Sequence, residues 1–118
     1  MEGTNTRTVG IAWYDRNEYP SARNAMTDAQ SLPLDYDAWL RTAELVIMLE
    51  EARGSDVIRA PIHPTTFAAW CRATGQKPDI HARTRHVNLA VEDYCAAMRT
   101  IRADTFVEDA DVEESASA

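Results

Sequence analysis

Two short segments of the chain have the hydrophobic pattern of β-strands. In residues 7–14, every second residue from Val9 onward is a large apolar one, which places these side chains on one face of an extended segment. Residues 56–62 predict a second strand. Pro61 has no N–H to donate, so we expect it at the end of that strand or on a sheet edge.

Apolar residues spaced three and four apart predict helices in the rest of the chain. Asp15 is expected to cap the first helix, which should reach about Ala29. Asp35 and Gly54 have the residue types of an N-cap and a C′ position, and they bracket a second helix.

The second half of the chain predicts two further helices. Thr65 or Thr66 should cap a short helix that ends at Gly75. Asp79 should cap a long helix that continues to about Arg102. The predicted fold class is therefore α+β: one small domain with two short strands and about four helices in a βαα-βαα order. Two strands form too little sheet to be stable alone, so we expect them to pair and to be covered by helices.

The helix predicted after Asp35 carries five consecutive apolar residues, Leu45 to Leu49. One face of a surface helix cannot bury such a run, because successive side chains point around the whole helix. Val46 and Ile47 continue the inward stripe, which leaves the other three to meet a second chain. We therefore predict a homodimer whose contact residues are Leu45, Met48 and Leu49; the alternative is that this helix is central in the monomer and the whole run belongs to its core.

Three sequence blocks carry a resemblance to known proteins. They are Ile-Ala-Trp-Tyr at 11–14, Tyr-Asp-Ala-Trp-Leu at 36–40, and Phe-Ala-Ala-Trp-Cys at 67–71 followed by Gly75. Through these blocks, the stretch from residue 11 to about 90 resembles a family of small uncharacterised bacterial proteins with no assigned function. The resemblance implies a small α+β bacterial protein, and it implies no activity or catalytic residue.

Charge is distributed unevenly along the 118 residues, whose formal net charge is −7. Residues 104–118 hold six of the nineteen acidic residues and no Lys or Arg. We expect them to form a disordered acidic tail, because so few apolar groups cannot offset the entropy lost on ordering. The predicted domain, residues 6–103, is nearly neutral, so the acidity of the whole chain does not argue against a nucleic-acid partner.

The compartment follows from what the chain lacks. No apolar run approaches the roughly 20 residues of a membrane-spanning helix, and the N-terminus has no basic segment followed by an apolar one. Cys71 and Cys95 fit no disulfide framework and are interpreted as reduced, buried residues. We therefore expect a cytoplasmic protein that does not enter the membrane.

Two groups of residues are candidates for ligand binding. Tyr14 and Arg16 follow the first strand and His63 follows the second, so parallel strands would bring them together beside helix N-termini that favour an anion. The alternative is that these positions hold only capping and turn residues. No metal site is expected, because His81 and His86 are the only His or Cys residues at a ligand-like spacing, and on a helix they diverge by about 140°.

The second group could contact nucleic acid. Residues 65–102 predict a helical hairpin in which Arg83, Arg85 and His86 occupy the first turns of the second helix, where a recognition helix carries its base contacts. The excess of basic residues in this region is small, so DNA or RNA binding is the alternative interpretation and not the favoured one.

The sequence contains no catalytic or cofactor-binding motif: there is no Gly-x-Ser-x-Gly and no phosphate-binding glycine loop. We therefore predict no catalytic residue, no metal and no cofactor. The leading hypothesis is a protein-binding or regulatory module whose partner the sequence does not identify. The alternatives are a nucleic-acid-associated regulator and a small enzyme or anion-binding protein with a site near Arg16 and His63.

Overall fold

The structure is a computed structural model that describes residues 7–117, with side chains described for residues 7–103. Within these residues the fold is α+β, with a two-stranded sheet and four α-helices. The elements follow one another as β1, α1, α2, β2, α3 and α4, and a short 3₁₀ helix (Ala29–Ser31) lies between α1 and α2. The predicted fold class and the βαα-βαα order are confirmed.

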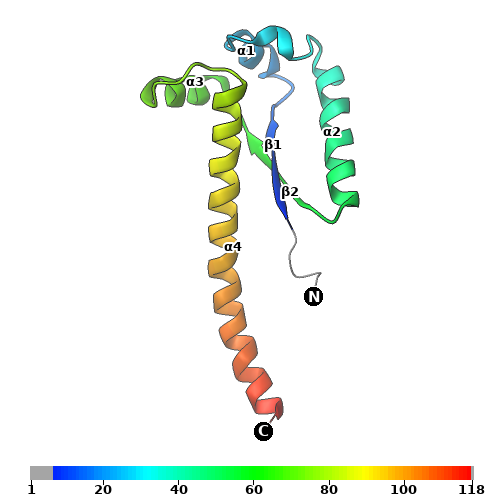
Figure 1. Cartoon of the computed structure of the whole chain (residues 1–118), viewed down its shortest axis with the longest axis vertical. Coiled ribbons are helices and arrows are strands. Elements are labelled where there is room, and N and C mark those ends of the chain that lie inside the picture. The colour runs from blue at the N-terminus through cyan, green and yellow to red at the C-terminus, as the bar shows by residue number, and fades with distance from the viewer. Residues whose placement is uncertain (1–6, 118) are drawn as a thin grey trace.

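The strands β1 (Thr8–Trp13) and β2 (Asp56–Pro61) are parallel, with Gly10 opposite Ile58. They lie between the long helices α2 and α4 (Figure 1). Pro61 is the last residue of β2, as expected for a residue without an N–H.

Helix α4 packs directly on β1 at Gly10. A Cβ atom added to Gly10 would lie 2.6 Å from Cγ1 of Val87 and 2.6 Å from Cγ2 of Val91. Only a glycine fits at position 10, because α4 occupies the space that a side chain would need.

Helix α1 is shorter than predicted and spans Tyr19–Asn24. The prediction that Asp15 is its N-cap is wrong: the N-cap is Glu18, and its side chain makes no capping hydrogen bond. Pro20 explains the later start, because a proline is tolerated only in the first turn, where its missing N–H has no partner within the helix. Residues 15–18 form a turn instead, in which Glu18 N–H donates to the carbonyl of Asp15.

Helix α2 (Tyr36–Ala52) begins and ends where the sequence predicts. The Asp35 carboxylate accepts a hydrogen bond from the N–H of Ala38, and Gly54 adopts a φ of 90° just after the helix.

Helix α3 (Pro64–Ala73) differs from the prediction, because its N-cap is His63 and not a threonine. Pro64 occupies the first turn, and its fixed φ favours a helix that starts there.

Helix α4 spans Ile80–Ser117 and is longer than the predicted helix. The Asp79 carboxylate accepts hydrogen bonds from the N–H groups of His81 and Ala82, which confirms the predicted cap. The helix does not end near Arg102, because the following residues contain no glycine or proline to stop it. The side chains of the predicted acidic tail, residues 104–118, lie outside the described part of the structure.

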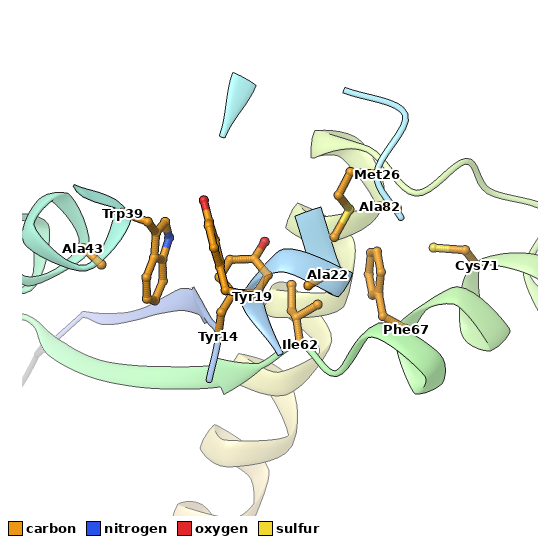
Figure 2. Close-up of a cluster of buried hydrophobic side chains, with 10 residues drawn as sticks. All are labelled: Tyr14, Tyr19, Ala22, Met26, Trp39, Ala43, Ile62, Phe67, Cys71 and Ala82. Atoms are coloured by element: carbon orange, nitrogen blue, oxygen red, sulfur yellow. The ribbon is translucent and has the colours of Figure 1, made fainter. Parts of the chain in front are cut away.

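The hydrophobic core lies at the carboxyl ends of the two strands. Here the ring of Tyr14 meets those of Tyr19 and Trp39 edge to face, with centroids 5.4 and 5.1 Å apart. By contrast, every residue of β1 is only half-buried. The core cluster comprises Tyr14, Tyr19, Ala22, Met26, Trp39, Ala43, Ile62, Phe67, Cys71 and Ala82 (Figure 2).

Candidate functional site

The loops that follow the two strands meet at the carboxyl-terminal edge of the sheet, where both strands end, as the sequence predicts. Trp13 is opposite Pro61, and its carbonyl oxygen accepts a hydrogen bond of 2.8 Å from the N–H of Ile62. The residues after each strand, which include the predicted ligand-binding residues, are therefore close in space.

Arg16 does not present a free guanidinium to a ligand at this edge. Its Nη2 donates to Asp37 Oδ1 at 2.8 Å, and the guanidinium lies 4.7 Å from the centre of the Tyr36 ring. Arg16 thus joins the turn after β1 to the first turn of α2.

His63 is paired with a carboxylate of the same chain. Its Nδ1 lies 2.9 Å from Glu18 Oε1, and this hydrogen bond raises the pKa of His63 above its ordinary value of 6.5. Ligand atoms of Asp15, Glu18 and His63 all lie within 4.8 Å of one another. Two carboxylates repel an anion, so this arrangement contradicts the predicted anion site.

The same three side chains have the donor types that bind zinc and similar divalent ions, although the sequence predicts no metal. Sequence reasoning missed the cluster because Asp15 and Glu18 have the spacing of a capping box, which accounts for both acids within one helix. The sequence does contain a signal for this cluster. Asp15 and Glu18 lie two and five residues after the first strand, and His63 lies two residues after the second. Glu18 and His63 are already paired with each other without an ion.

Tyr14, the third predicted ligand-binding residue, is buried with only 1% of its surface exposed. Its hydroxyl is the one described buried side-chain group without a hydrogen-bond partner. Burial raises the pKa of Tyr14 to about 12, so the phenol is neutral at physiological pH. Tyr14 is a core residue and is not accessible to a ligand.

The predicted nucleic-acid residues do not form one surface. Arg83 is 5% exposed, and its Nη1 and Nη2 donate to the two carboxylate oxygens of Asp28 at 2.8 and 3.0 Å. His86 packs edge-on against Phe67 and Trp70, and its Nε2 lies 3.1 Å from the carbonyl oxygen of Pro61. Arg83 cannot reach a phosphate or a base, which corrects the prediction, and only Arg85 of the three is exposed.

The residues predicted to form a dimer contact lie on the outer side of α2. Leu45, Met48 and Leu49 are 51%, 60% and 56% exposed, whereas Ile47 on the inner side is buried. Val46 differs from the prediction, because it is 38% exposed and does not continue the buried stripe. We call Leu45, Val46, Met48 and Leu49 the α2 apolar surface.

A groove of about 480 Å³ lies beside this surface, between α2 and β1. Its lining is mostly apolar and includes Val46, so the groove and the α2 apolar surface are continuous. The lining also includes Ile11, Ala12, Leu32, Trp39, Ala43 and Ile80.

No family model, curated protein or solved structure matches the chain. The resemblance to small bacterial proteins therefore stays a prediction. Among the described residues, no helix is long and apolar enough to span a membrane.

Proposed function

We propose that the protein is an interaction module without catalytic chemistry that acts by binding protein, and that it associates with itself as a homodimer through the α2 apolar surface. The observation that carries this proposal is the exposure of Leu45, Met48 and Leu49 on a single helix. Contiguous apolar surface of this kind usually marks an interaction site, because its exposure to water is unfavourable.

The α2 apolar surface is one continuous patch. Successive residues of a helix are rotated by about 100°, so Val46, Leu49, Leu45 and Met48 follow one another around α2, from the groove to the outer face. Leu45 lies near the middle of this arrangement around the helix. It is therefore the position at which a charge should weaken association most.

The alternative functions have less support. The nucleic-acid interpretation retains only Arg85 as an exposed basic residue of the predicted set, since Arg83 is bound to Asp28. The anion-binding interpretation needs free positive charge, but Arg16 and His63 are both paired with carboxylates.

A cytoplasmic location fits this proposal. Cys71 is a buried free thiol and Cys95 a half-buried one, and free thiols are the rule in reducing compartments. We propose that the protein is a bacterial cytoplasmic protein, in agreement with the family resemblance.

Multi-angle light scattering on Leu45→Glu tests the proposal. The unmodified protein should have the mass of a dimer at high micromolar concentration, and Leu45→Glu should be a folded monomer with an unchanged circular dichroism spectrum. Leu34→Glu is the matched control, because Leu34 is 81% exposed and lies before α2, away from the apolar surface. It makes the same chemical change and should remain dimeric. A monomeric unmodified protein, or equal effects of the two variants, would contradict the proposal.

A further inference from the structure

One edge of β1 has unpaired peptide groups. The carbonyl oxygens of Arg7 and Trp13 accept hydrogen bonds from Asp56 and Ile62, so the odd-numbered residues of β1 direct their peptide groups toward β2. Peptide groups alternate along a strand, and those of Thr8, Gly10 and Ala12 therefore point to the opposite edge. No hydrogen bond between described residues reaches these three peptide groups.

This edge lacks the features that protect the edges of natural sheets. Exposed edges usually carry charges, prolines or a covering element that prevents pairing with another strand. The outer edge of β2 has Arg59, Pro61 and the contact between His86 and the Pro61 carbonyl. By contrast, Thr8–Trp13 contains no charged residue and no proline. The β1 edge therefore has the properties of an edge that is covered in the functional protein.

Both sides of the β1 edge are bordered by apolar surface. On the α2 side lies the 480 Å³ groove, and on the α4 side a smaller depression of about 240 Å³ is lined by Ile11, Ile80 and Val87. Ile80 is 52% exposed where it borders both hollows. A strand added beside β1 would fill the space between α2 and α4 and bury these side chains.

We infer that the added strand is β1 of a second copy, paired antiparallel about a two-fold axis at Gly10. This inference rests on the proposed homodimer and specifies its register. With the two-fold axis at Gly10, Thr8 of one copy lies opposite Ala12 of the other. Each outward peptide group of β1 then has a hydrogen-bond partner in the other copy. The charged residues that flank β1, Arg7 before the strand and Asp15 after it, are both exposed, so antiparallel pairing brings opposite charges to the same end of the joined strands. The interface is thus complementary in charge to itself.

The register also brings the two α2 helices to the same side of the joined sheet. A two-fold axis perpendicular to a sheet does not exchange the two faces of the sheet. The face of β1 that packs on α2 in one copy is therefore on the same side of the joined sheet as the equivalent face of the other copy. Trp13 identifies this face by its contact with Trp39, at a centroid distance of 5.1 Å. Val46 lines the groove beside α2 and would face the partner across the new strand pair, with Leu49 next to it around the helix.

Amide hydrogen exchange measured by NMR at two protein concentrations tests this inference. The amides of Gly10 and Ala12 should exchange slowly in the dimer and at least tenfold faster on dilution to monomer. The amides of Ile11 and Trp13, which face β2, should change little. Protection of Gly10 and Ala12 that does not depend on concentration would mean that one chain covers its own edge, which would overturn the inference.

A proline variant separates this inference from the proposed function. Thr8→Pro removes an outward N–H without touching the ladder to β2, and it should weaken dimerisation at least tenfold, whereas Thr8→Ala keeps the N–H and should dimerise normally. If the unmodified protein is a dimer but Thr8→Pro associates as well as Thr8→Ala, the strand pairing is wrong and association through α2 stands. If the unmodified protein is a monomer, both proposals fail.

Discussion

Arg83 and Asp28 form a bidentate ion pair that joins the start of α4 to the segment after α1, 55 residues earlier in the chain. The same carboxylate accepts a hydrogen bond from the N–H of Ile80. Asp28 thus holds both the backbone and a side chain of the first turns of α4. Because Arg83 is buried, loss of its partner would leave a charged group away from water.

We therefore predict that Asp28→Ala lowers the free energy of unfolding by about 3 kcal/mol, the magnitude typical of breaking one side of a buried pair. Asp37→Ala is the control: it breaks the exposed pair with Arg16, and such pairs contribute less than about 1 kcal/mol. Urea denaturation at neutral pH measures both. Equal losses would show that Arg83 is not effectively buried.

The pH dependence of the Asp28 contribution has a definite sign. The hydrogen bond from Arg83 lowers the pKa of Asp28 below its ordinary value of 3.8. The stabilisation is therefore present above that value and is lost as the pH falls through the lower pKa of the folded state. The difference between the unmodified protein and Asp28→Ala should persist at neutral pH and shrink only in acid.

The sequence predicts the fold well because the relevant signals are local. Asp35 and Gly54 fix the ends of α2 through capping chemistry that depends only on neighbouring residues. The misplaced helix starts, at Asp15 and at Thr65 or Thr66, have a common cause: a proline nearby determines the start more strongly than a capping side chain does. Giving Pro20 and Pro64 more weight would have corrected both.

The candidate sites are harder to predict because they depend on partners far away in the sequence. Arg83 looks like a surface residue on a helical pattern, and only the tertiary position of Asp28 makes it a buried one. His63 likewise acquires Glu18 as a partner across 45 residues. The exposure of Leu45, Met48 and Leu49 could be predicted because five consecutive apolar residues exceed what one helix face can bury.

We predict that the imidazole of His63 titrates above pH 6.5 and that Glu18→Gln lowers this pKa, because the main cause of the raised value is the hydrogen bond to the Glu18 carboxylate. NMR titration of the histidine ring protons measures both values. An unchanged pKa of His63 in Glu18→Gln would show that the pair does not form in solution.

The same pair should make stability depend on pH. A histidine whose pKa is raised on folding stabilises the protein fully below its unfolded pKa, and this stabilisation is lost as the pH rises through the folded value. Unfolding measured across this range should show such a decrease in the unmodified protein and a smaller one in His63→Gln. Both groups are substantially exposed, so the change should be small.

Two tyrosines in contact should respond differently to loss of their hydroxyl groups. The Tyr14 hydroxyl is buried without a partner, so Tyr14→Phe should leave the free energy of unfolding unchanged or raise it by about 1 kcal/mol. The Tyr36 hydroxyl donates to the carbonyl oxygen of Tyr14 at 3.1 Å, and Tyr36→Phe should lower the free energy of unfolding by about 1 kcal/mol. Each change removes one oxygen atom and keeps the ring, so each variant serves as the control for the other in urea denaturation. An equal loss in Tyr14→Phe would mean that its hydroxyl has a hydrogen-bond partner, such as a buried water.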